Sequence, residues 1–271
     1  MKTPMKIWMV DFAREQAPTL NHLYEYASVA QEGGYTALGL YLEHRFAYPS
    51  APWAAGVGAI TPGMVKNLQS EFPSLEIIPF ITLLGHFEGM LYTEEGKKYA
   101  EEKFKGMQAC PCNPDFLKFA RELLNDTIET FNAQVIHIGG DETWQLGLCN
   151  KCKEIVEGAE GDGKAKLYGD HFGPLAQEVI DAGRTPAIWG DMFLDHLEAL
   201  DAMPKETLIF DWQYFKGLGD SADKFTSRGF KVIGSPTLHV YNAAWMHLEK
   251  SDENVREVSR DSQNLEGVCL T

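Results

Sequence analysis

The chain of 271 residues is short of basic side chains, since 24 Lys and Arg face 39 Asp and Glu and leave a formal net charge of −15. This imbalance argues against a nucleic-acid partner, because binding a phosphate backbone needs clustered Lys and Arg. No apolar run approaches the roughly 20 residues of a membrane helix, and charges at Asp11, Arg14 and Glu15 interrupt the start of the chain where a secretory signal would stay apolar. We therefore expect a cytoplasmic protein with no nucleic-acid or membrane partner.

Cysteine is also scarce, with five residues in the whole chain. An odd and low number argues against a disulfide scaffold and fits a reducing compartment. Hydrophobic residues make up 44% and charged residues 23%, an ordinary globular composition that excludes disorder. We see no linker or internal repeat, so residues 1–271 are predicted to form a single catalytic domain.

Short apolar runs alternate with amphipathic, helix-like stretches along the chain. The helices are expected near 20–32, 62–72, 113–131 and 165–182, with shorter ones later. Eight strands alternating with helices predict an α/β fold, a (β/α)8 TIM barrel. The expected strands are 7–10, 37–42, 76–82, 134–138, 185–189, 207–212, 231–234 and 267–270.

The eighth expected strand is followed by Thr271 alone, so the barrel apparently lacks its last helix. A barrel open in this way exposes apolar surface on its first and last strands, and exposed apolar patches usually mark an interface. We therefore expect a homodimer, in which a partner could also contribute an aromatic side chain to the site.

Chemically active side chains gather directly after three of the strands, where the active site of a parallel barrel lies. His86 follows the third strand, Asp141 and Glu142 follow the fourth after a Gly-Gly pair, and Asp191 follows the fifth. Two carboxylates at a barrel mouth are the equipment of a glycoside hydrolase, with one acid to protonate the leaving oxygen and one anion to face positive charge. Tryptophans stack on sugar rings, and those near strand ends are Trp144, Trp189 and Trp212.

The motif HIGGDE at 137–142, with LLGH about fifty residues upstream and AIWGDMF downstream, resembles glycoside hydrolase family 20, the β-N-acetylhexosaminidases. The likeness looks closest to the hexosaminidase D-like branch. It implies that Glu142 is the general acid/base and that Asp141 stabilises the substrate's own 2-acetamido group, which acts as the nucleophile. As an acid working near neutral pH, Glu142 should have a raised pKa. The reaction would need no catalytic cofactor.

The resemblance assigns further residues to the binding of an amino-sugar glycoside. His86 and His137 match histidines that support the catalytic pair, and Trp189 and Trp212 match walls of the acetamido pocket. Tyr214 is a candidate hydroxyl donor to the acetamide oxygen. Asp191 either contacts sugar hydroxyls or caps the next helix. Trp144 completes the set of expected substrate-binding residues.

Two departures from the family pattern keep an alternative open. Lys6 stands where the family usually has an Arg that holds sugar hydroxyls, and the Trp expected after the eighth strand is missing. A catalytically impaired sugar-binding barrel is therefore the second hypothesis. A metal-dependent enzyme with His86, Asp141 and Glu142 as ligands is a weaker third one, because hard oxygen ligands for a divalent cation are not evident.

Four of the five cysteines form two closely spaced pairs, Cys110 with Cys112 and Cys149 with Cys152. The pairs come before the third long helix and after the fourth strand, which are adjacent sectors of a barrel. Four converging thiolates could form a structural zinc site, and the alternatives are reduced thiols or a disulfide. The sequence does not choose between the glucosamine and galactosamine epimers.

Overall fold

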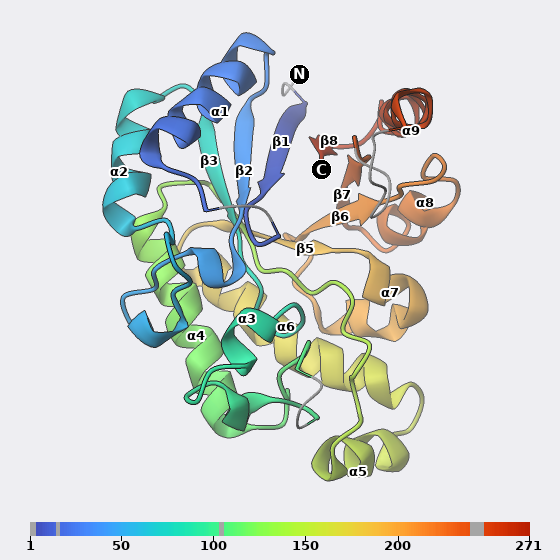
Figure 1. Cartoon of the computed structure of the whole chain (residues 1–271). Helices are drawn as coiled ribbons and strands as arrows, with labels where there is room; N and C mark the ends of the chain where they lie inside the picture. Colours follow the sequence, from blue (N-terminus) through green and yellow to red (C-terminus); the bar gives the residue numbers. More distant parts are fainter. Residues whose placement is uncertain (1–3, 15–16, 103–105, 239–246) are drawn as a thin grey trace.

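A computed structural model describes residues 4–14, 17–102, 106–238 and 247–271 of the chain. Its centre is a closed barrel of eight parallel strands in sequence order, in which β1 pairs with both β2 and β8. The predicted (β/α)8 barrel is confirmed, and Figure 1 shows β8, near the C-terminus, beside β1. The strands are β1 (Met5–Asp11), β2 (Ala37–Tyr41), β3 (Glu76–Phe80), β4 (Val135–His137), β5 (Thr185–Trp189), β6 (Leu208–Trp212), β7 (Lys231–Ser235) and β8 (Gly267–Leu270).

Helices surround the barrel and begin where the sequence supplies caps. The Asn113 side chain accepts backbone N–H bonds at the start of α4, and Thr61 does so for α2, in each case just before a Pro that needs no hydrogen-bond partner. The helices are α1 (Leu20–Glu32), α2 (Pro62–Glu71), α3 (Glu88–Leu91), α4 (Pro114–Thr130), α5 (Asn150–Gly158), α6 (Gly163–Asp181), α7 (Asp191–Asp195), α8 (Ser221–Thr226) and α9 (Leu248–Asp261). Short 3-10 turns are η1 (Glu43–Arg45), η2 (Pro52–Ala54), η3 (Lys97–Tyr99) and η4 (Leu197–Ala202). Within the described ranges, no helix is long and apolar enough to span a bilayer.

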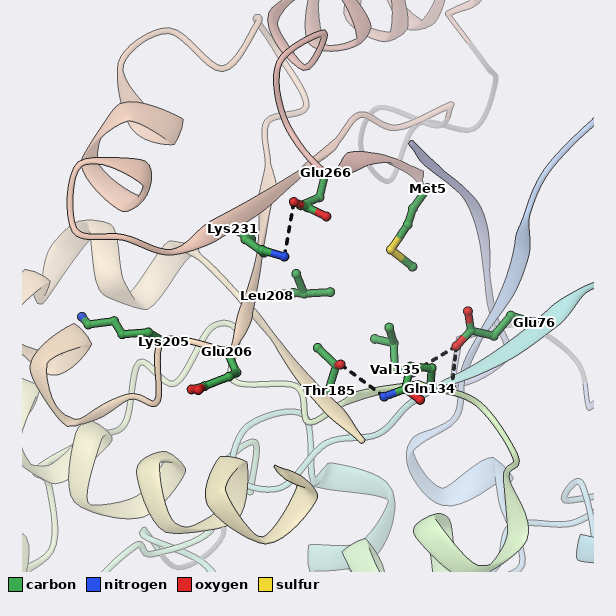
Figure 2. A pocket seen from close by; sticks show the side chains of 10 residues that line it. All are labelled: Met5, Glu76, Gln134, Val135, Thr185, Lys205, Glu206, Leu208, Lys231 and Glu266. Atoms are coloured by element: carbon green, nitrogen blue, oxygen red, sulfur yellow. Dashed lines mark hydrogen bonds and ion pairs between the residues drawn. The ribbon is translucent and has the colours of Figure 1, made fainter. Parts of the chain in front are cut away.

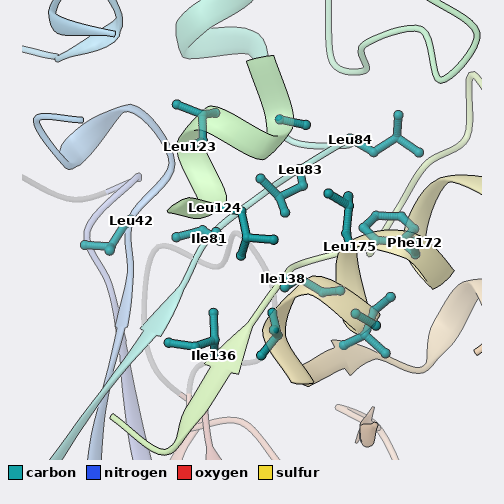
Figure 3. Close-up of a cluster of buried hydrophobic side chains, with 14 of the residues drawn as sticks. Leu42, Ile81, Leu83, Leu84, Leu123, Leu124, Ile136, Ile138, Phe172 and Leu175 are labelled. Carbon is teal, nitrogen blue, oxygen red and sulfur yellow. The ribbon is translucent and has the colours of Figure 1, made fainter. Parts of the chain in front are cut away.

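Two apolar clusters hold the strands in place. One lies between the strands and the helices; Figure 3 shows the part where Ile81 and Ile136 meet Leu124 of α4 and Leu175 of α6. The other fills the barrel interior with inward-facing side chains such as Phe80. Because the barrel is filled, a ligand can reach the strand ends but cannot pass through the middle.

The outer side of β1 is only partly covered. Trp8 and Val10 line a groove of about 560 Å³ together with Tyr26 and Val29 of α1. This partly buried apolar surface lies where the sequence predicted an exposed seam. The homodimer expected from that seam stays a prediction.

Candidate active site

The carboxylates Asp141 and Glu142 follow β4 on a tightly turned backbone. Gly139 and Gly140 have φ values of +80° and +98°, a backbone conformation that residues with a Cβ rarely adopt. A Cβ on Gly139 would also lie 2.7 Å from the carbonyl oxygen of Ile81. Glu142 itself has a φ of +49°. A non-glycine residue held in this region is strained, and such strain is concentrated at functional sites. The paired glycines therefore provide the turn that the sequence predicted.

His86, in the loop after β3, contacts both members of the pair. Its Nε2 lies 3.2 Å from Oδ2 of Asp141 and 3.3 Å from Oε2 of Glu142. Burial lowers the pKa of His86, but the hydrogen bonds to the two carboxylates outweigh this and raise it above its ordinary value. His86 is 5% exposed and has a φ of +50°, so the surrounding structure fixes it in this position. Two neighbouring carboxylates thus converge on one nitrogen.

The electrostatic state of Glu142 differs from the sequence prediction. The hydrogen bond from His86 lowers the pKa of Glu142, and this effect exceeds the opposing one of partial burial. The expected raised pKa is therefore wrong for the protein without substrate, because the sequence does not show that a histidine donates to this carboxylate. Glu142 remains 37% exposed at the barrel mouth and can be reached by a substrate.

Two residues that the sequence analysis missed complete the charged network. Arg14, just after β1, places Nη2 2.8 Å from Nδ1 of His86, while its Nη1 lies 3.0 Å from Asp11 and 3.3 Å from Glu43. The Arg14 guanidinium also covers the ring of Tyr41, 5.4 Å from its centroid. Arg14 is 49% exposed, so part of its planar donor set faces the open mouth.

Glu43 is the buried member of this network. It lies directly after β2 in η1, is 5% exposed and has a φ of +41°. Burial raises the pKa of Glu43 to about 7, although Arg14 and His86 oppose the shift. The signal that could have identified Arg14 and Glu43 was their place shortly after strands. Arg14 follows β1 and Glu43 follows β2, as Asp141 follows β4.

Lys6 is not part of the site. It lies in the first half of β1, paired with Val268 of β8, whereas Asp11 and the site are at the other end of the strand. Lys6 is exposed and lies away from the mouth, because strand direction places residues five apart at different ends of the barrel. It remains a departure from the family pattern and has no contact with the described residues of the site. Arg14 supplies the guanidinium at the mouth.

Asp191, the first residue of α7, supports the turn that carries Asp141 and Glu142. Its Oδ2 accepts the backbone N–H of Glu142 at 2.9 Å. Burial and the neighbouring Asp141 together raise the pKa of Asp191 to about 7, although hydrogen bonds, including one from Trp212, oppose the shift. The contact with Glu142 is one that neither sequence hypothesis, sugar contact or helix cap, included.

The predicted residues His137 and Trp189 lie in the upper barrel core. The ring of His137 is fully buried and stacks on Phe80 at 4.4 Å, next to Trp189 at 4.5 Å and Phe210 at 4.9 Å. Its Nδ1 accepts the N–H of Gly139, and burial places its pKa well below the ordinary value. His137 therefore supports the turn through packing and one backbone hydrogen bond. Trp189 is 3% exposed and its buried indole nitrogen has no hydrogen-bond partner among the described residues.

The remaining predicted aromatics surround the mouth to different degrees. Trp212, the last residue of β6, and Tyr214, just after it, lie together with ring centroids 4.9 Å apart. The Tyr214 hydroxyl accepts a hydrogen bond from Thr271 at 3.2 Å, and burial raises its pKa. Trp144 is 55% exposed and its backbone N–H donates to the backbone carbonyl of Glu142, so it stands on the rim.

A cavity of about 500 Å³ lies at the opposite end of the barrel (Figure 2). Met5, Glu76, Thr185 and Lys231, which line it, are the first residues of their strands. Figure 2 shows them around the opening, with an ion pair of 3.5 Å between Lys231 and Glu266. Active sites of this fold lie at the carboxyl ends of the strands, so this cavity is not the site of the chemistry.

The chain matches the family model of the glycosyl hydrolase family 20 catalytic domain over residues 68–267. Among curated proteins, it is 30% identical to the beta-hexosaminidase subunit beta of Entamoeba histolytica over 129 residues, which are 45% of this chain and 21% of that protein. It is 24% identical to beta-hexosaminidase A of Caenorhabditis elegans over 74% of this chain and 40% of that protein. The chain thus spans less than half the length of these relatives.

Solved structures show the same fold at low sequence identity. The beta-N-acetylhexosaminidase of Bacteroides fragilis has a TM-score of 0.80 at 18% identity, covering 98% of this chain and 60% of that one. The exo beta-N-acetylglucosaminidase of Vibrio harveyi, solved in complex with N-acetylglucosamine, has a TM-score of 0.77 at 17% identity, covering 99% of this chain and 50% of that one. These likenesses support the barrel assignment.

Proposed function

Since this chain belongs to glycosyl hydrolase family 20, we propose that it is a retaining exo-β-N-acetylhexosaminidase that removes terminal β-linked GlcNAc or GalNAc. The observation that carries the proposal is the convergence of Asp141 and Glu142 on Nε2 of His86. In retaining enzymes with a protein nucleophile, two carboxylates face each other across the glycosidic bond. Here neighbouring carboxylates approach from the same turn, which favours the substrate's 2-acetamido group as nucleophile.

The two carboxylates differ in exposure, and this supports different roles. Glu142, 37% exposed, can reach the leaving oxygen as general acid and later activate water as base. Asp141 is 17% exposed and lies deeper, where an anion can stabilise the positive charge that grows on the acetamido group as it attacks the anomeric carbon. No cofactor takes part in these steps.

The lowered pKa of Glu142 sets a requirement on this mechanism. Glu142 must hold a proton when the leaving oxygen departs, yet His86 favours its ionised form. We propose that a bound sugar excludes water from the mouth and weakens the contact with His86. Both changes raise the pKa of Glu142 towards the value that a general acid needs.

The aromatic and basic side chains suit a neutral amino sugar. Trp189 and Trp212 can enclose an acetamido group, with the indole N–H of Trp189, which has no partner among the described residues, as a donor. Arg14 can donate to sugar hydroxyls from the opposite side of the mouth. Trp144 on the rim can stack on the sugar beyond the cleaved bond. The cytoplasmic location and the hexosaminidase D-like branch stay predictions.

Hydrolysis of aryl β-GlcNAc, aryl β-GalNAc and aryl β-glucoside, measured side by side, tests the proposal. We expect cleavage of one or both amino sugars and a rate for the plain glucoside at least about a thousandfold lower, because it has no acetamido nucleophile. Comparable cleavage of the glucoside would exclude substrate assistance. Binding of the amino sugar without turnover would instead support an impaired sugar-binding barrel.

A further inference from the structure

Four cysteines meet where two long loops touch, outside the catalytic mouth. Cys110 and Cys112 end the connection between β3 and α4, and Cys149 and Cys152 begin α5. The Cys110 sulfur lies 3.5 Å from that of Cys149 and 3.7 Å from that of Cys152, which in turn is 3.2 Å from the sulfur of Cys112. Residues far apart in sequence thus place four sulfur atoms in one cluster.

The spacing of the sulfurs fits a tetrahedral metal site. A disulfide needs sulfurs about 2.05 Å apart, so none is formed. Four thiolates about 2.3 Å from one zinc ion lie about 3.7–3.8 Å from each other. The distances from Cys110 to Cys149 and Cys152, 3.5 and 3.7 Å, are close to this value, whereas Cys112 and Cys152 are 3.2 Å apart. Cys110 is 7% exposed and Cys152 is fully buried, whereas Cys112 and Cys149 are half-buried. We propose that Cys110, Cys112, Cys149 and Cys152 bind one structural Zn²⁺.

The local backbone favours thiolates at this position. Cys149 is the N-cap of α5, and its sulfur accepts the backbone N–H of Cys152 at 3.4 Å. The start of a helix stabilises negative charge, and Lys151 lines the hollow beside the sulfurs. The Cys149–Cys152 pair is therefore arranged as half of a metal site before any ion binds.

Glu101 is the other potential ligand, because one of its oxygens lies within 4.8 Å of the sulfurs of Cys110, Cys149 and Cys152, a group that does not include Cys112. The sulfur of Cys112 contacts that of Cys152, so the proposed site needs the Cys112 side chain to turn towards the ion. Its two oxygens already accept hydrogen bonds, Oε1 from the N–H of Cys149 at 2.9 Å and Oε2 from the thiol of Cys152 at 3.4 Å. We assign Glu101 to the outer shell, where a carboxylate orients ligands. Four sulfur ligands leave no open position, so the metal is structural.

The cluster joins the loops that carry His86 and Glu142. Next to it, Gln108 and Gln145 exchange two hydrogen bonds, each side-chain oxygen accepting the other residue's backbone N–H at 3.0–3.1 Å. Zinc at the four sulfurs would fasten the same two loops together a few residues further on. The metal thereby positions His86 against Glu142 without touching the substrate.

Metal analysis of protein purified without chelators tests the site independently of catalysis. We expect about one zinc per chain, and less than about a tenth of that in Cys110→Ser and Cys152→Ser. Cys269→Ser is the matched control, because Cys269 is a buried cysteine in β8, away from the cluster, and should keep the zinc. Glu101→Gln should also keep it, and loss of zinc from that variant would overturn the four-cysteine assignment.

Two measurements on the wild-type chain keep the test valid if a serine variant does not fold. A mercurial thiol reagent should release the zinc in step with modification of the cluster thiols, and Co²⁺ exchanged into the site should show thiolate charge-transfer and tetrahedral absorption bands. Absence of metal, or stoichiometric iron in place of zinc, would overturn the assignment. Since none of these readouts uses a glycoside, their failure is distinct from failure of the proposed hydrolase activity.

Discussion

Replacement of Glu43 by Gln should make the protein more stable at neutral and alkaline pH. Glu43 is 5% exposed, and burial raises its pKa from 4.5 to about 7. Between these values the folded protein holds a proton that the unfolded chain has released, so folding stability falls as pH rises through this window and the loss is complete above pH 7. At about 1.4 kcal/mol per pH unit, the loss is about 3 kcal/mol.

Glutamine has nearly the same shape and cannot ionise, so it removes this pH dependence. The free energy of unfolding, measured by urea denaturation, is compared between Glu43→Gln and the wild type at pH 4.5 and at pH 8. The difference, variant minus wild type, should be about 3 kcal/mol larger at pH 8 than at pH 4.5. Glu25→Gln, on the exposed face of α1, is the control and should show no comparable trend. Parallel pH profiles for Glu43→Gln and the wild type would refute the reasoning.

The same variant should lose activity, because Glu43 holds Arg14 by an ion pair of 3.3 Å. A gain in stability with a fall in kcat/KM is the expected sign of a group kept for function at the expense of folding. If kcat/KM were unchanged, Glu43 would have no part in positioning Arg14.

Two further predictions concern the catalytic turn and the guanidinium. Glu142→Gln should lower the rate of hydrolysis of a natural disaccharide by about 10²–10⁴-fold and that of an activated aryl glycoside much less. Asp141→Asn should lower the rates for both substrates to a similar degree. The same dependence on the leaving group in both variants would contradict the assigned roles. Arg14→Lys should lower kcat/KM by about ten- to hundredfold through loss of the planar guanidinium donors. Lys6→Ala, at the far end of β1, should leave kcat/KM unchanged. A larger loss of kcat/KM in Lys6→Ala than in Arg14→Lys would contradict the placement of Lys6 outside the site.

The architecture could be predicted from the sequence because a parallel barrel leaves a strong pattern of buried strands between capped helices. The bounds of α1, β5 and β8 agree with the expected ones, and Asn113 caps α4 as its position before a Pro indicated. The helix α5 was predicted as loop. Its N-cap is a cysteine, which is not among the usual capping residues, so the start of the helix could not be recognised.

The site was predictable only where a motif runs along the chain. The run from His137 to Glu142 carried the resemblance, but the partners of Glu142 come from other strand ends. Arg14 and Glu43 act through contacts across four strands that no local pattern records. The direction of the Glu142 pKa shift depends on the position of His86, and spacing in sequence does not give that position.

The strain and the charge of the site occur at the ends of three consecutive strands. Glu43, His86 and Glu142 follow β2, β3 and β4, and each has a φ between +41° and +50°, where a side chain is disfavoured. Together with Arg14, they place carboxylates, a guanidinium and an imidazole in a partly buried space, which costs folding energy that ordinary packing would not require. A positive charge developing on a bound sugar would relieve the repulsion between these carboxylates. With the proposed function, the arrangement would therefore stabilise the transition state more than the resting protein.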